Sequence, residues 1–300
     1  MNTQLKKLIT ISLGLALVSL FVACDGQNKK VESKKEGAAF ESKREIFVVT
    51  REQGSGTRDA FVELTGILVK VDGKKKDNTS KEALTIDGTQ AVMSNIAGNE
   101  YAIGYISLGS LNSSVKAISV NGNPISAETV KNGTYPISRP FNIATKGTVS
   151  AVAEDFIAFI LSDEGQAVVE KNGYIAVQSG TKYAGKKPSG KIVIAGSSSV
   201  SPVMEKLKEA YLAINSNAQI EIQTNDSSAG MVAAKEGTCD IGMASRALKD
   251  SEKEVLQSTV IAMDGIAVIV NNKNPLKSLS MSQIREVFTG FIRNWEAVIE

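Results

Sequence analysis

Three short loops of glycine, serine and threonine carry the residue types that an oxyanion-binding site needs. They are Arg51–Arg58 (REQGSGTR), Gly196–Ser201 (GSSSVS) and Asp226–Gly230 (DSSAG), and each lies between a strand-like run and a helical pattern. A helix N-terminus offers unpaired backbone N–H groups and the positive end of the helix dipole. Glycine lets the backbone approach a ligand closely, and hydroxyl groups add neutral donors. A single loop of this kind is usually only a turn or a cap, but three together predict an oxyanion site.

Arginine supplies a fixed fork of charged donors for such an anion, and Arg51, Arg58 and Arg246 lie in or near these loops. No GxxxxGK[ST] sequence occurs, so a nucleotide P-loop is not supported. Histidine is absent from the chain, which removes Ser-His-Asp and Cys-His catalysis and the commonest metal ligand. We therefore expect a binding protein rather than an enzyme, without catalytic residues, cofactor or metal.

The charge balance argues against nucleic acid as a partner. Once Lys6 and Lys7 are set aside with the N-terminal segment described below, acidic and basic residues are equal in number. Proteins that bind nucleic acid usually show a basic excess or stripe. A chain of 300 residues is also longer than one hydrophobic core usually holds, so two lobes are expected.

The N-terminus has the pattern of an export signal. Lys6 and Lys7 precede a mostly apolar run, residues 8–23, that is too short for a comfortable membrane span. The run ends in LFVAC, which resembles a bacterial lipobox whose cysteine, here Cys24, is lipidated and becomes the mature N-terminus. We expect residues 1–23 to be a lipoprotein signal peptide and residues 24–44 to be the lipidated Cys with a flexible tether. A plain secretory signal cleaved near residue 23 is the alternative.

In the remaining chain, residues expected to form strands alternate with residues expected to form helices, which predicts an α/β fold. Strands are expected at 45–50, 101–108, 115–120, 141–145, 192–195, 219–223, 240–244 and 260–270. Helices are expected at 58–64, 83–97, 149–161, 162–171, 201–214, 229–235 and 280–288, with Ser201 as a cap and Pro202 at the first helical position. Residues 70–81 are expected to form a polar loop, residues 178–191 an internal linker, and Cys239 a small buried side chain.

The chain closely resembles the phosphate-binding proteins of bacterial phosphate ABC importers, a branch of the type II periplasmic-binding-protein family. The stretches that carry the resemblance are VVTREQGSGTRDAFVEL, AIGYISLGSL, YPISRPFNI, IVIAGSSSVSPVMEKLKEAY, SSAGMVAAKEGTCDIGMASRALKD, IAMDGIAVIVN and IREVFTGFIRNWEAV. Together they sample nearly all of residues 45–298. The resemblance implies a two-lobed fold with a hinge of two crossing strands.

The resemblance also implies the residues that hold the phosphate. From one lobe they are Ser198, Ser199 and Ser227, and from the other they are Arg51, Ser55, Gly56 and Thr57. Arg58 and Arg246 are additional candidates; Arg58 could instead be a solvated residue of a first helical turn, and Arg246 could pair with an acid such as Asp250.

Two departures from the family pattern stand out. Arg246 occupies the place of an Asp that, in the family, accepts a hydrogen bond from the protonated oxygen of hydrogen phosphate, a donor that sulfate lacks. Two roles are open to Asp226, which are substitution for this Asp and capping of the following helix. The order of segments also differs, because the half that begins with TREQGSGTR comes first here.

The order of segments predicts a circular permutation in which the linker joins the former ends. One lobe is then expected to comprise 45–143 and 268–300, the other 144–267, with hinges near 141–145 and 266–270. A monomer is expected, and a domain-swapped dimer is the alternative.

The resemblance implies an extracytoplasmic lipoprotein that captures inorganic phosphate and delivers it to the permease subunits of an ABC importer. It would be anchored in a cell-envelope membrane through the acylated Cys24. The alternatives are a binding protein for another tetrahedral oxyanion, sulfate foremost, and a surface phosphate sensor or adhesin without transport. A phosphatase ranks last, because the chain has no histidine.

Overall fold

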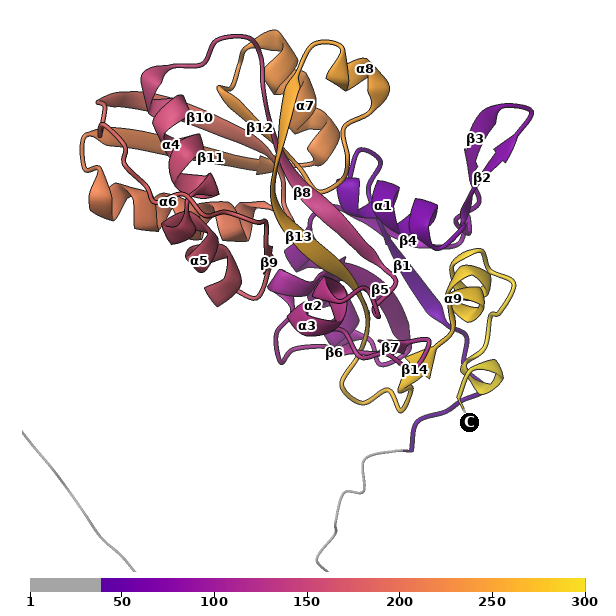
Figure 1. The fold of residues 1–300 in the computed structure, drawn as a ribbon. Coiled ribbons are helices and arrows are strands. Elements are labelled where there is room, and N and C mark those ends of the chain that lie inside the picture. Colours follow the sequence, from indigo (N-terminus) through magenta and orange to yellow (C-terminus); the bar gives the residue numbers. More distant parts are fainter. Residues whose placement is uncertain (1–38, 300) are drawn as a thin grey trace, which may run out of the picture. The chain divides into compact units, whose positions relative to one another are not determined.

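The computed structural model describes residues 39–299, which fold around a ten-stranded mixed sheet (Figure 1). The main path of the sheet runs β11-β10-β12-β8-β13-β5-β1-β4, and β6 and β9 pair with β13. Its strands are β1 (Phe47–Arg51), β4 (Leu84–Ile86), β5 (Ala102–Ser107), β6 (Lys116–Ala117), β8 (Ser138–Thr145), β9 (Ile175–Ala176), β10 (Gly190–Ser197), β11 (Ala218–Asn225), β12 (Ile241–Ala244) and β13 (Gln257–Val270). The predicted α/β class is confirmed.

Helices cover this sheet, and two small ribbons lie outside it. The helices are α1 (Gly56–Leu64), α2 (Thr89–Gly98), α3 (Ala127–Lys131), α4 (Ala151–Leu161), α5 (Asp163–Lys171), α6 (Ser201–Ile214), α7 (Ser227–Glu236), α8 (Asp250–Lys253) and α9 (Met281–Phe288), with short 3₁₀ turns η1 (Leu108–Ser110) and η2 (Trp295–Ala297). The ribbons are β2 (Leu68–Val71) with β3 (Lys74–Asp77), and β7 (Ser119–Val120) with β14 (Ser278–Leu279).

The described chain has two sets of core residues, one in each half of the sheet. In the first set, side chains of β1, β5 and the C-terminal part of β13 pack against α1 and α9 on one face and α2 on the other. In the second set, side chains of β8, β10 and β12 pack against α4 and α6 on one face and α7 on the other. We call these the Arg51 half and the Ser198 half. The lobe boundaries at 143 and 267 stay a prediction.

The strands β8 and β13 connect the halves (Figure 1). They pair antiparallel from Gln257↔Thr145 to Gly265↔Ser138, and then β13 continues alongside β5 from Ile266 to Val270. Since these are the two long strands shared by both halves, they contain the segments 141–145 and 266–270 that the sequence suggested as hinges. A buried ion pair joins them, with Arg139 Nη2 3.1 Å from Asp264 Oδ2.

Three local predictions are wrong, and each has a backbone reason. Residues 70–81 are not a loop throughout, because β2 and β3 form a hairpin whose turn residues Asp72 and Gly73 have φ of 51° and 75°, the positive values of a type I′ turn. Residues 83–97 are not one helix, because β4 comes first and Gly88, with φ of 80°, interrupts the chain before α2. The cap of α6 is Val200, so Ser201 is already helical.

The two ends of the folded part lie side by side. Glu45 and Asn294 form an antiparallel bridge, and Ile46 N donates to Arg293 O at 2.6 Å. Residues 178–189, by contrast, contain no helix or strand, and the Tyr183 hydroxyl in that segment donates to Asp155. Adjacent ends are what a permuted chain requires, although permutation itself stays a prediction.

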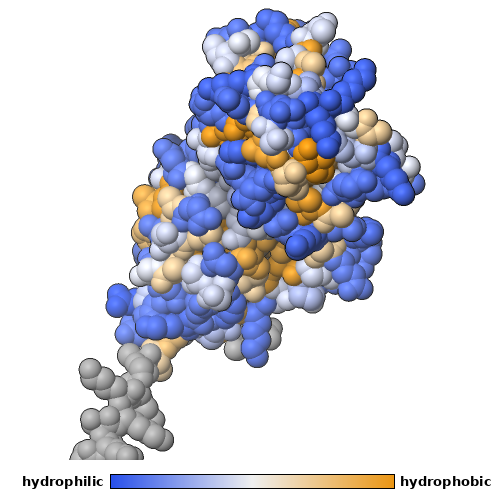
Figure 2. Space-filling view, turned by 90° about the vertical axis from the view of Figure 1, so that its left-hand side faces the viewer, coloured by the Kyte–Doolittle hydropathy of each residue, from blue (hydrophilic) through white to orange (hydrophobic). Residues whose placement is uncertain are grey.

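The face turned toward the reader in Figure 2 is hydrophilic at its top and margins, with hydrophobic side chains gathered toward its middle. Apolar atoms contribute more than half of the surface of ordinary folded proteins. The apolar area alone therefore identifies no partner. Among the described residues, no helix has both the length and the apolar character needed to cross a membrane.

Candidate functional site

The loop between β1 and α1 presents its polar groups toward the Ser198 half. Arg51 ends β1 and is only 2% exposed. Gly54 has φ of 91°, a conformation that glycine adopts without strain, and it turns the chain into the helix. Ser55 caps α1, because its hydroxyl accepts a hydrogen bond from Arg58 N. The structure therefore confirms that the Arg51–Arg58 loop lies between a strand and the start of a helix.

The Arg51 guanidinium reaches across the boundary between the halves. Its Nη2 donates to Ser198 Oγ at 3.0 Å, and its Nη1 donates to Thr89 Oγ1 at 3.3 Å. The adjacent Glu52 receives Nε and Nη2 at 2.7 Å each. Burial raises the pKa of Glu52, but the hydrogen bonds and charge of Arg51 outweigh burial and hold that pKa below its ordinary value. This pairing fixes the plane of the guanidinium.

Hydroxyl groups from three helix starts meet beside Arg51. Thr57 Oγ1 lies 2.8 Å from Ser199 Oγ, and Thr89 Oγ1 lies 3.1 Å from Ser199 Oγ and 3.3 Å from Ser198 Oγ. Thr57, Thr89 and Ser199 are at most 2% exposed. Hydroxyls can turn from one another toward a ligand, so this cluster is a set of neutral donors next to one fixed cation. An oxyanion is the ligand that such donors suit.

The DSSAG loop packs against the glycine turn of the first loop. Ser227 is fully buried, and its Oγ accepts a hydrogen bond from Ser245 N at 3.1 Å. A Cβ placed on Gly56 would stand 2.4 Å from Ser227 Oγ. The first loop thus approaches Ser227 at a distance that only a glycine at this position permits.

Asp226 serves as a helix cap in this structure. Its Oδ1 accepts a hydrogen bond from Ala229 N at 2.8 Å, the N-cap interaction of α7. This is one of the two roles that the sequence left open for Asp226. The carboxylate also lies next to Gly54, since a Cβ there would be 2.7 Å from Oδ1.

Two of the three predicted arginines are held away from the hydroxyl cluster by acidic partners. Arg58 donates from Nε and Nη2 to Asp77 Oδ2, and from Nη1 to the carbonyl oxygen of Arg51 at 2.7 Å. It is therefore 8% exposed rather than solvated, and it braces the end of β1. The structure does not bring its guanidinium to Ser198 or Ser199.

Arg246 pairs with Glu252 and not with the acid suggested from the sequence. Nη1 and Nη2 donate to the two carboxylate oxygens of Glu252 at 2.8 Å each, while Asp250 is fully exposed. Burial raises the pKa of Glu252, but Arg246 outweighs burial and holds that pKa below its ordinary value. Arg246 Nε lies 3.1 Å from Asp59 Oδ2 in the other half.

Sequence reasoning missed Thr89, Glu52 and Ser245. Thr89 is the first residue of α2 and repeats the glycine-then-hydroxyl pattern of the other loops, in Asp87-Gly88-Thr89. That signal was hidden because residues 83–97 were expected to form a single helix. The predicted lipidation residue, Cys24, lies outside the described residues.

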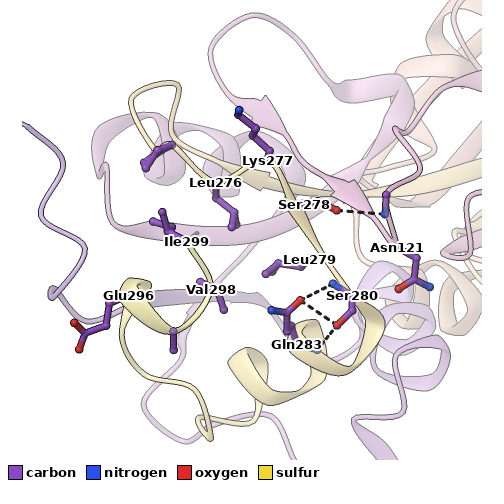
Figure 3. Close-up of a pocket in the computed structure, with 13 residues that line it drawn as sticks. Asn121, Leu276, Lys277, Ser278, Leu279, Ser280, Gln283, Glu296, Val298 and Ile299 are labelled. Carbon is purple, nitrogen blue, oxygen red and sulfur yellow. Dashed lines mark hydrogen bonds between the residues drawn. The ribbon is translucent and has the colours of Figure 1, made fainter.

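A hollow of about 850 Å³ lies elsewhere, between β14, α9 and the C-terminal segment (Figure 3). Its polar side chains Ser280 and Gln283 already bond to one another in the capping box at the start of α9. Lys277 is the one charged donor among the described residues that line it, and no arginine lies there as at the Arg51 site. Within residues 39–299, no three acidic or cysteine side chains are grouped so that they could hold a metal ion.

Known proteins resemble this chain over most of its length. A family model described as "PBP superfamily domain" matches residues 29–164 and 181–299. The phosphate-binding protein PstS 2 of Streptococcus agalactiae is 51% identical over 85% of this chain and 88% of its own length. The protein of the same name from Streptococcus pneumoniae is 45% identical over 98% of this chain and 99% of its own.

A solved structure gives the same result for the fold. The crystal structure of a phosphate-binding protein of a phosphate ABC transporter from Streptococcus pneumoniae superposes with a TM-score of 0.68 at 48% identity. The match covers 85% of this chain and 99% of that one.

Proposed function

The chain belongs to the PBP superfamily, and we propose that it captures inorganic phosphate between its two halves for delivery to an ABC importer. The observation that carries the proposal is the meeting of Arg51, Thr57 and Thr89 with Ser198 and Ser199 across the boundary. The names of the relatives, which refer to phosphate binding and not to a reaction, support the same function.

Capture works through replacement of water by fixed donors. Arg51 supplies charge, and the N-termini of α1, α2 and α6 supply the positive ends of helix dipoles. Each donor that already has a fixed position loses little entropy when the anion arrives. Hydrogen phosphate offers four oxygens to these donors, so no covalent step is needed.

A hinged closure brings the two sets of donors together. Ser198 and Ser199 belong to the Ser198 half, whereas Arg51, Thr57 and Thr89 belong to the other. The connection through β8 and β13 allows rotation of one half against the other about two strands. The closed form then docks on the permease subunits, which open it.

Selectivity for phosphate over sulfate rests on an acceptor for the hydrogen bond that the protonated oxygen of hydrogen phosphate donates. The guanidinium of Arg246 has no hydrogen-bond acceptor, and Asp226 Oδ1 already accepts from Ala229 N in the cap of α7. Asp226 Oδ2 remains available as an acceptor beside Gly54. If no carboxylate serves, sulfate becomes the second candidate ligand, and a calorimetric titration with both anions distinguishes the two.

The N-terminal segment completes the proposal. Lipidation of Cys24 would insert acyl chains into the outer face of a cell-envelope membrane, and residues 25–39 would tether the folded part to it. Residues 40–44, which the sequence assigned to the tether, belong instead to the folded part, since Ser42 O and Arg44 O accept hydrogen bonds from Glu296 N and Trp295 N. The protein would act outside the cytoplasm as a monomer. The adjacent ends at Glu45 and Asn294 support a circular permutation that leaves each half intact.

Labelled phosphate tests this function in equilibrium dialysis with the full chain in mild detergent. We expect wild-type protein to retain phosphate and Arg51→Gln to lose at least about tenfold in affinity, because a charge-assisted hydrogen bond contributes about 1.5–3 kcal/mol. Arg285→Gln is the matched control, since Arg285 lies on the exposed face of α9, where Nη2 contacts Ser282. Equal retention by all three proteins, or by none, contradicts the proposal.

A further inference from the structure

Arg246 and Asp59 form a charge pair between the two halves. Arg246 follows β12 in the Ser198 half, and Asp59 lies in the first turn of α1 in the Arg51 half. Arg246 Nε is 3.1 Å from Asp59 Oδ2, and Lys249 Nζ is 3.4 Å from the same oxygen. One carboxylate of the Arg51 half therefore faces two cations of the other.

Arg246 is rigid before it meets Asp59. Its guanidinium is held by both oxygens of Glu252, and its Nη1 also donates to Ala247 O at 3.0 Å. The side chain is 5% exposed, whereas that of Asp59 is 33% exposed. Surface ion pairs usually gain little because two flexible side chains must be ordered. Here one partner is already ordered, so that cost is reduced.

The pair is completed only while the halves are in contact. Arg246 Nε and Asp59 Oδ2 are buried, and neither makes an aligned hydrogen bond to any group in the described structure. If the other half were absent, Asp59 would lose Arg246 and Lys249 as counter-charges, whereas Arg246 would keep Glu252. Rotation of the halves apart would return both atoms to water. The neighbouring contact from Ser228 N to Gly54 O, at 3.1 Å, crosses the same boundary.

We infer that Asp59, acting through Arg246 and Lys249, stabilises the closed form and so sets how tightly the anion is held. Asp59 is a positioning residue, since no contact joins it to Ser198, Ser199 or Thr57 in the described structure. The inference rests on the proposed function. A group that favours the closed form raises the affinity for any ligand that this form encloses.

The separation of the halves tests the inference directly. Spin labels at Lys131→Cys on α3 and Glu209→Cys on α6 place exposed reporters on opposite halves, in a chain with Cys24→Ser; Cys239 is buried. Distance distributions are measured with and without inorganic phosphate. We expect Asp59→Asn to shift the population toward the longer distance, and 0.5 M NaCl to reduce the difference from wild type by screening.

Asp250→Asn is the matched control, because Asp250 is fully exposed and, among residues 39–299, forms its ion pair with Lys253 of its own helix. Asp59→Glu keeps the charge and is expected to restore most of the wild-type distribution. Distributions that coincide for wild type and Asp59→Asn, both with and without phosphate, overturn the inference. So does an equal shift in Asp250→Asn.

Phosphate affinity separates this inference from the proposed function. We expect Asp59→Asn to bind inorganic phosphate about two- to fivefold more weakly at low salt, the range for an ion pair that is partly exposed. If wild-type protein binds no phosphate but Asp59→Asn still separates the halves, the pair is established and the proposed function fails. If phosphate binds to both proteins with equal affinity, Asp59 does not set the affinity.

Discussion

Substitution of Gly56 by alanine should prevent closure without disturbing either half. Gly56 is the first residue of α1, and an added Cβ would lie 2.4 Å from Ser227 Oγ, 2.8 Å from Ser245 Oγ and 3.1 Å from Arg246 Cγ. All three atoms belong to the Ser198 half. Its backbone conformation is open to any residue, so alanine brings a steric effect and no dihedral strain.

The size of the effect follows from the overlap. Ordinary contact with a Cβ begins at 3.4 Å, so the closest approach is short by about 1 Å. Overpacking of this kind costs about 1–3 kcal/mol. Ser227 and Ser245 are both fully buried, and Ser227 Oγ already accepts from Ser245 N, so the hydroxyls cannot simply turn away. Because the cost falls on the closed form, affinity for phosphate should drop roughly 5- to 150-fold.

Isothermal titration calorimetry with inorganic phosphate measures this drop, and thermal unfolding without phosphate measures stability. Gly98→Ala is the control, because a Cβ at Gly98, the last residue of α2, would meet no atom within 4 Å. We expect Gly98→Ala to bind as wild type does. Unchanged phosphate affinity in Gly56→Ala would refute the close approach of the halves, and a large fall in its Tm without phosphate would refute a cost confined to closure.

Two further predictions concern groups that sequence reasoning missed or placed differently. Thr89→Val removes the hydroxyl next to Ser199 and should weaken phosphate binding about three- to tenfold, in line with a neutral hydrogen bond, whereas Thr89→Ser should retain binding; equal titrations for both variants would contradict a role for the hydroxyl. Glu252 has a folded-state pKa below its ordinary 4.5, so its stabilising effect is present above that pH and lost as pH falls through the lowered pKa. Urea unfolding should therefore show a smaller loss of stability between pH 6 and pH 3 in Glu252→Gln than in wild type, and parallel losses would contradict the ion pair with Arg246.

Local sequence signals were sufficient where a short segment decides its own structure. The helix start at Ser280 was predictable because a capping hydroxyl and the following helical pattern are neighbours in the chain, whereas α1 begins at Gly56, before the expected start at residue 58. The same applies to the strand expected at 260–270, which is mostly buried from Ile261 onward and apolar except for Asp264. Where glycine interrupts a pattern, as at Gly88, periodicity alone favoured a single helix and concealed β4 and Thr89.

The ion-pair and hydrogen-bond partners of the arginines were harder to predict, because they depend on the path of the chain in space and not on spacing in the sequence. Asp250 and Glu252 follow Arg246 at similar spacing, and only the turn of α8 decides that Glu252 faces the guanidinium while Asp250 faces solvent. The pairing of Arg58 with Asp77 likewise depends on the β2–β3 hairpin, which the sequence analysis took for a loop. The contact of Arg51 with Ser198 spans the two halves, so no local pattern reports it.

The most direct test of phosphate capture is a calorimetric titration of the full chain in mild detergent, first with inorganic phosphate and then with sulfate, after bound anion has been removed. The proposed function predicts one-to-one binding of phosphate and no heat from sulfate. Equal binding of both anions would make the site a general oxyanion site, and absence of binding by phosphate would contradict its capture between the Arg51 and Ser198 halves.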